Sequence, residues 1–119
     1  MKYILLINQG DAPTPYDAQA WERLSDEERT AIYRGYQAIN ETPGVSPGVQ
    51  MQPPKTATTV RVKDRRTLTT DGPYVATKEA LGGYLVFEAD DLDAAIELAS
   101  QVPAARLGGA VEVRPLVEG

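Results

Sequence analysis

A chain of 119 residues, 42% hydrophobic and 24% charged, has the size and composition of one globular domain, which we expect to span residues 1–119. The absence of cysteine excludes disulfides and thiolate chemistry, and the absence of histidine removes the commonest general base and metal ligand. The net charge of −5 and the scattered Lys and Arg residues argue against a nucleic-acid partner, because phosphate binding needs clustered cations.

The first predicted element is a strand over Lys2–Asn8. Its apolar residues fall on both sides, with Tyr3, Leu5 and Ile7 on one and Ile4 and Leu6 on the other, which is typical of a central strand covered on both faces. The run is too short for a signal peptide, and no other apolar run is long enough to cross a bilayer. We therefore expect a cytoplasmic protein that does not enter a membrane.

A helix in two parts follows a loop that contains two prolines. The first part is predicted over Asp17–Leu24. Ser25 and Glu28 then form a capping box that begins the second part. Its apolar face is predicted to consist of Ile32, Tyr36 and Ile39, and the helix should end at Pro43 and Gly44.

The middle of the chain predicts a strand and then a β-hairpin. The strand covers Val45–Met51, with Val49 and Met51 alternating against two glutamines. The hairpin pairs Thr58–Lys63 with Thr67–Thr70 through a turn at Asp64-Arg65. Its alternation predicts that Val60 and Val62 face inward.

The C-terminal part predicts a strand, a helix and a last strand. The strand Gly83–Glu88 is again apolar on both faces. Asp90 or Asp91 caps the helix, whose stripe is predicted to be Leu92, Ala95, Ile96 and Ala99, and which Pro103 ends. The last strand covers Val111–Val117, with Val111 and Val113 inward.

The resulting order is β-α-β, a β-hairpin, then β-α-β. Without the hairpin this is the split βαβ of a ferredoxin-like α+β fold. Two helices cover only one face of such a sheet, although two of its strands are apolar on both faces. We therefore expect a homodimer in which the second faces of two sheets pack together.

The segment TTDGPYVATKE, residues 69–79, holds the most compact cluster of reactive side chains. Asp71 is the candidate catalytic residue, as a base or a ligand anchor at a cavity mouth; alternatively it only shapes a turn by accepting backbone N–H bonds. Lys78 and Glu79 form either a solvated pair or a binding site for a substrate carboxylate. Tyr74 and Tyr84 are candidate cavity walls. No cofactor is expected, and the acidic residues match no metal-ligand spacing.

Several segments resemble the YCII-related proteins, and within them the subgroup named for an Asp-Gly-Pro-Phe motif. They are MKYILLI, QPPKTATTVRV, TDGPYVATKEALGGY and AARLGGAVEVRP, and the motif itself reads Asp71-Gly72-Pro73-Tyr74 here. The change of Phe to Tyr at Tyr74 keeps the ring and adds a hydroxyl. The resemblance covers nearly the whole chain and implies a ferredoxin-like chain that dimerises into an α/β barrel with a cavity beside the sheet.

The resemblance also implies two classes of function. Some YCII-related proteins carry a His-Asp pair regarded as catalytic, and a few relatives act on small chlorinated or hydroxylated organic acids. That pair is impossible here because the chain has no histidine. We expect a dimeric protein that binds a small anionic or hydroxylated molecule. The alternatives are a cofactor-independent lyase or isomerase that uses a carboxylate or tyrosine, and a non-catalytic regulatory partner, since members of the subgroup are often encoded beside extracytoplasmic-function sigma factors.

Overall fold

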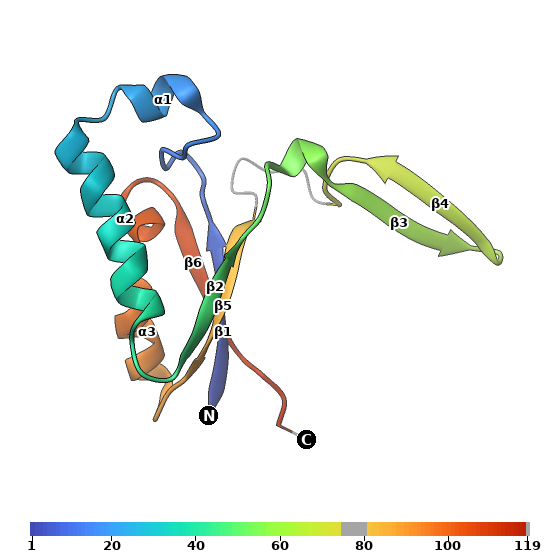
Figure 1. The fold of residues 1–119 in the computed structure, drawn as a ribbon. Coiled ribbons are helices and arrows are strands. Elements are labelled where there is room, and N and C mark those ends of the chain that lie inside the picture. Colours follow the sequence, from blue (N-terminus) through green and yellow to red (C-terminus); the bar gives the residue numbers. More distant parts are fainter. Residues whose placement is uncertain (75–80, 119) are drawn as a thin grey trace.

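The computed structural model describes residues 1–74 and 81–118 (Figure 1). It contains strands, α-helices and one short 3-10 helix at Pro54–Thr56. In chain order the other elements are β1 (Lys2–Asn8), α1 (Ala18–Glu22), α2 (Asp26–Asn40), β2 (Val45–Gln50), β3 (Thr58–Lys63), β4 (Arg66–Asp71), β5 (Leu81–Glu88), α3 (Leu92–Ser100), α4 (Pro103–Arg106) and β6 (Ala110–Pro115).

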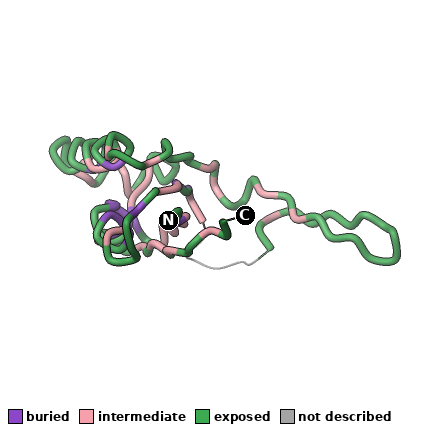
Figure 2. The backbone as a smooth tube through the Cα atoms, turned by 90° about the horizontal axis from the view of Figure 1, so that it is seen from below, coloured by how far each residue is buried: buried purple, intermediate pink, exposed green. Residues whose placement is uncertain are grey.

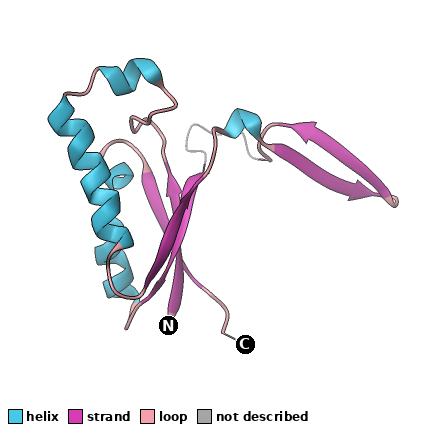
Figure 3. Cartoon of the chain, viewed as in Figure 1, coloured by secondary structure: helices cyan, strands magenta, loops and turns pink. Residues whose placement is uncertain are grey.

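Four strands form one antiparallel sheet in the order β2-β5-β1-β6, while β3 and β4 pair with each other and with no other described strand. The two central strands are thus the two that are apolar on both faces. At the middle of β1, Leu5 pairs with Leu85 on one side and with Val113 on the other. Helices α2 and α3 lie on one side of the sheet, which makes the chain an α+β protein (Figures 1 and 3).

The hydrophobic core lies between this sheet and the helices. Strand alternation directs every second residue of β1 toward α2 and α3, and these residues are buried. Leu5 and Leu85 are almost completely excluded from solvent, and Ile39 of α2 packs in the same cluster. The cluster consists of Tyr3, Leu5, Ile7, Ala12, Ile39, Leu85, Ala89, Ala95, Leu98, Ala99, Val102 and Ala104.

Helix α2 begins where the capping box predicted it. The Ser25 hydroxyl accepts a hydrogen bond from the Glu28 amide at 3.0 Å, and the Glu28 carboxylate accepts one from the Ser25 amide at 3.0 Å. These bonds lower the pKa of Glu28, because they stabilise its charged form. Ile32 and Ile39 are buried on one face and Tyr36 is half-buried beside them, which confirms the predicted apolar face.

The other face of the sheet, which we call the open face, has no helix over it among the residues that the structure describes. Ile4 and Leu6 are only half-buried there. Ile4 pairs with Val86, and Leu6 pairs with Tyr84, so the centre of this face is apolar. An ion pair between Arg114 and Glu112 lies at its β6 edge. The prediction that β1 is covered on both faces is therefore not met within one chain.

The hairpin β3–β4 projects away from the sheet on the side opposite the helices (Figures 1 and 2). Asp64 and Arg65 turn the chain with φ of 51° and 65°, the left-handed pair expected of a two-residue hairpin turn. Val60 and Val62 are 59% and 69% exposed, so the prediction that they face inward is wrong. Alternation places them on one face of the hairpin, but no described element packs against that face.

Other details of the prediction also differ. The buried residues of α3 are Ala95, Leu98 and Ala99, whereas Leu92 and Ile96 are about half exposed, because small alanines allow the closer approach to the sheet. Buried Pro103 begins α4 as well as following the end of α3. Val49 is exposed, since the β2–β5 register shifts between Ser46 and Val49. In the part of the chain that is described, no helix is long and apolar enough to cross a membrane.

Candidate functional site

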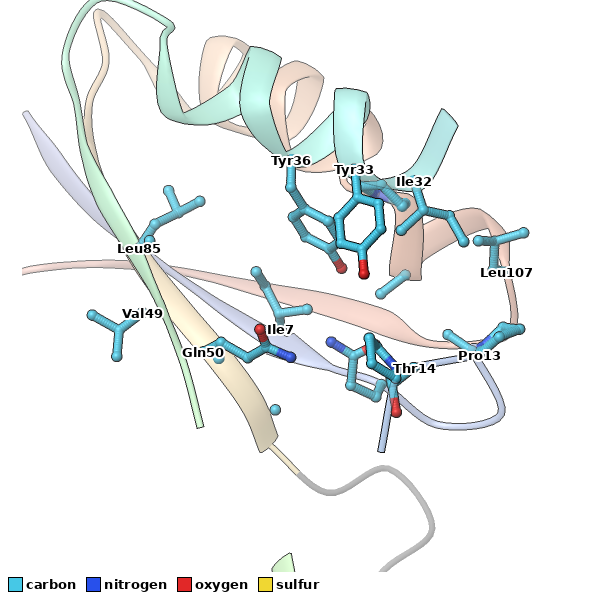
Figure 4. Close-up of a pocket in the computed structure, with 18 of the residues that line it drawn as sticks. Ile7, Pro13, Thr14, Ile32, Tyr33, Tyr36, Val49, Gln50, Leu85 and Leu107 are labelled. Atoms are coloured by element: carbon cyan, nitrogen blue, oxygen red, sulfur yellow. The ribbon is translucent and has the colours of Figure 1, made fainter. Parts of the chain in front are cut away.

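A cavity of about 250 Å³ lies between α2 and the end of the sheet where β2 and β5 meet. Its floor comes from β1, β2 and β5, its roof from α2, and its far wall from the loop after β1 and from α4 (Figure 4). Most of the lining is apolar. Its polar side chains are Gln9, Thr14, Tyr33, Tyr36, Asn40 and Gln50.

Tyr36 is the central polar side chain of this cavity. Figure 4 shows its hydroxyl pointing from α2 toward the sheet, where Ile7 and Gln50 lie. Burial raises the pKa of this hydroxyl above its ordinary value of 10.0, and the nearby polar groups of the Gln9 side chain and the Ala104 backbone act in the opposite direction. At neutral pH Tyr36 is therefore a neutral group that can donate and accept hydrogen bonds.

An aromatic pair lines the cavity beside Tyr36. The rings of Trp21 and Tyr33 meet edge to face, with centroids 5.5 Å apart and an interplanar angle of 74°. Arg29 holds the corner between α1 and α2 by donating to the backbone oxygens of Trp21 and Leu24, at 3.0 and 2.7 Å. This corner fixes the only tryptophan of the chain at the cavity.

Gln9 is positioned by a glycine of β5. A Cβ on Gly82 would lie 2.5 Å from Cγ of Gln9, so only a glycine lets this side chain lie against the strand. The neighbouring Gly83 allows β2 to approach β5, since a Cβ there would lie 2.6 Å from the Val49 oxygen. The glycine pair therefore permits close chain contact at the edge of the cavity.

A second hollow of about 290 Å³ adjoins the first and shares Gln9, Ala12, Thr14, Gln50 and Gly82 with it. Its lining includes two carboxylates, Asp11 and Asp17. In contrast, the described lining of the first cavity contains no charged side chain. In the described ranges, no three acidic residues lie close enough together to hold a metal ion.

Of the residues predicted from the TTDGPYVATKE segment, neither of the two that the structure describes, Asp71 and Tyr74, lines this cavity. Asp71 is exposed as the last residue of β4, opposite Thr58, and Tyr74 is 75% exposed. Tyr84 borders the cavity, but strand alternation puts its ring on the open face beside Leu6, so its main chain is the part at the cavity. Lys78 and Glu79 lie outside the described residues.

The polar residues of the cavity were not singled out from the sequence. Gln9 directly follows β1, Gln50 ends β2, and Tyr36 belongs to the apolar stripe of α2. One signal in the sequence could have indicated the cavity. The apolar face of α2 contains the hydroxyl of Tyr36, and a buried Tyr usually has a hydrogen-bond partner.

Comparison with known proteins places this architecture in a family. The model of the YCII-related domain matches residues 1–118. The chain belongs to the YCII-related family. An uncharacterized protein of Rhizobium meliloti (strain 1021) is 31% identical to this YCII-related chain over 121 residues, covering 98% of the chain and 92% of that protein.

Proposed function

We propose that this YCII-related protein binds a small organic molecule in the cavity beneath α2. The observation that carries the proposal is the convergence of Tyr36, Gln9 and Gln50 on an apolar space of about 250 Å³. A mostly apolar hollow with a few polar groups that fix orientation is the usual form of a ligand site. The volume lies just below the range of about 300–1,000 Å³ for drug-sized ligands, which favours a smaller molecule.

The polar end of the ligand is a hydroxyl or a carboxylate. Tyrosine and amide side chains suit a hydroxyl, because each can both donate and accept a hydrogen bond. A carboxylate would need a cation, and Lys78, with Glu79 beside it, is the proposed source. The sequence between Tyr74 and Leu81 leads into β5, and Leu81 and Gly82 line the second hollow.

The proposed assembly is a homodimer of ferredoxin-like chains, each with β3–β4 as an inserted hairpin. The order β2-β5-β1-β6 with antiparallel neighbours supports this fold. The half-exposed Ile4, Leu6 and Val86 on the open face support dimerisation into an α/β barrel. The segment Asp71-Gly72-Pro73-Tyr74 supports membership of the Asp-Gly-Pro-Phe subgroup.

The alternative is a cofactor-independent lyase or isomerase. Tyr36 suits this role less than binding, because a raised pKa makes its ionised, basic form rarer at neutral pH. Asp71 would then be the base. Once a ligand is known, Asp71→Asn separates the two functions: loss of turnover with affinity retained would establish Asp71 as the base.

A thermal-shift comparison of benzyl alcohol and benzoate tests the proposed site. The two molecules share a body and differ in charge, and a ligand that binds only the folded state raises the melting temperature. We expect stabilisation by at least one of them, weakened by Tyr36→Phe and by Gln9→Ala. Thr30→Ala, an exposed change on α2, is the control.

The pattern of results identifies the polar end. Stabilisation by benzyl alcohol alone indicates the hydroxyl-binding form. Stabilisation by benzoate that Lys78→Ala removes indicates the carboxylate form. If neither molecule, nor a wider panel of small hydroxylated acids, raises the melting temperature, the cavity is not a ligand site, and the regulatory-partner function would take first place.

A further inference from the structure

The hairpin β3–β4 is the least protected part of the described chain. Every residue of both strands is exposed except Thr59, and Figure 2 shows the hairpin extending far beyond the rest of the molecule. Hydrogen bonds close its base, from the Gly72 amide to the Ala57 oxygen at 2.7 Å and from the Thr59 hydroxyl to the Gly72 oxygen at 2.8 Å. A two-stranded hairpin with no packing partner is marginally stable in water.

The two faces of the hairpin differ in chemistry. Cross-strand register places Val60 opposite Thr69 and Val62 opposite Thr67, which makes the outer part of one face uncharged and β-branched, while Asp71, opposite Thr58, ends this face at the base of the hairpin. We call Val60, Val62, Thr67 and Thr69 the valine face. The other face carries Arg61, Lys63 and Arg66, with Leu68 among them. Val60 and Val62 lie next to each other on the same face, and contiguous exposed apolar side chains mark candidate interaction sites.

The chain exposes more surface than a compact protein of its mass, and the size of this excess indicates how much area a partner could cover. The accessible surface is 8466 Å², whereas a compact protein of this mass exposes about 6,300 Å². The radius of gyration is 16.1 Å, against about 13.5 Å for a compact chain of 119 residues. The excess is about 2,200 Å² per chain, or about 4,400 Å² for two chains, which lies within the total of about 2,000–5,000 Å² that an obligate homodimer buries.

The positive charge of the hairpin favours an acidic partner, and the rest of this chain is itself acidic. Residues 58–71 contain four cations and two carboxylates, for a net charge of +2. Because the whole chain has a net charge of −5, the rest of the chain has a net charge of −7. A basic hairpin on an acidic body is attracted to the body of a second copy. The hairpin also extends on the side of the open face, where that copy would be seated (Figures 1 and 2).

From these observations we propose that the hairpin is a dimerisation arm, whose valine face packs against the body of a second copy of the chain. The inference rests on the proposed dimer and adds to it a second contact region, separate from the open face. The cations on the other side of the arm steer the encounter, so association should slow as salt is added.

Amide hydrogen exchange at increasing protein concentration tests the arm separately from the dimer. We expect exchange in residues 58–71 to slow as dimer forms, together with exchange in β1. Val60→Lys with Val62→Lys should raise the dimer dissociation constant by at least about tenfold, since each valine loses its burial. Leu68→Gln, an uncharged change on the other face of the same arm, is the control and should leave the constant unchanged.

A site-specific cross-link locates the contact. Because the chain has no cysteine, Val62→Cys introduces the only thiol, which can carry a benzophenone label. Cross-linking between two chains, absent for the same label at Ala31 on the exposed side of α2, supports the arm.

Each contrary outcome has a distinct meaning. If amide exchange slows in β1 as the protein concentration rises but does not slow in residues 58–71, the proposed dimer is supported and the proposed dimerisation arm is rejected. A monomer under all conditions rejects both. Protection of the arm only after heparin is added, independent of protein concentration, assigns it to a polyanionic partner and also rejects the arm proposed here.

Discussion

Tyr36 shows how one side chain can serve both core and cavity. Its ring continues the apolar face of α2, while its hydroxyl lies toward Gln9 and the sheet. Moving a neutral phenol into a partly buried site costs little when hydrogen bonds remain available, whereas ionising it there is costly. This difference between the two protonation states should appear in the stability of the protein.

We expect the free energy of unfolding to fall as pH rises above about 10, the pKa of an unfolded tyrosine. Because the folded pKa is raised, the unfolded state releases its proton first, so the stabilisation is complete below that pH and is lost on approach to the folded pKa. Tyr36→Phe should flatten part of this fall. Urea unfolding through the alkaline range measures it, with exposed Tyr16→Phe as control. An unchanged slope in Tyr36→Phe would contradict the burial of this hydroxyl.

Among the elements, α2 links the local sequence to the cavity most directly. Its start is set by the reciprocal hydrogen bonds of Ser25 and Glu28, and in the preceding short helix Asp17 caps α1 by accepting from the Ala20 amide at 3.2 Å. The roof of the cavity therefore depends on a helix whose register is fixed at its first turn. Weakening that cap should loosen the helix without touching the cavity lining.

Ser25→Ala should destabilise the protein by about 0.5–2 kcal/mol, the range for the loss of an N-cap hydroxyl. Ser25→Asp should be milder, since an Asp carboxylate can accept the same bond. Chemical unfolding followed by circular dichroism gives both values. Equal losses for Ala and Asp would mean that the hydroxyl bond to the Glu28 amide contributes nothing.

For the whole molecule, the two faces of β1 provide a direct test of the proposed dimer. Light scattering at micromolar concentration should report about twice the chain mass of 12.9 kDa. Leu6→Asp places a charge on the open face and should give a folded monomer, because Leu6 is only half-buried within one chain. Leu5→Asp places the same charge in the core, where Leu5 has no exposure, and should unfold the chain. A wild-type monomer, or a Leu6→Asp variant that remains dimeric, would refute the interface.

Local patterns determined the elements and their limits to within a few residues. Alternation in β1 identified both of its faces, the capping box located the start of α2, and Asp64-Arg65 located the hairpin turn. These features could be predicted because each depends on residues close together in the chain, through backbone geometry and caps. The α+β class followed from their order.

The tertiary structure decided which faces are covered and where the cavity lies. Alternation could assign Val60 and Val62 to one face but could not tell that no described element packs on it. The polar residues of the cavity, Gln9, Tyr36 and Gln50, come from three separate segments and meet only because β1 and β2 lie in one sheet beneath α2. Burial depends on contacts between residues distant in the chain, and a linear pattern contains no measure of those distances.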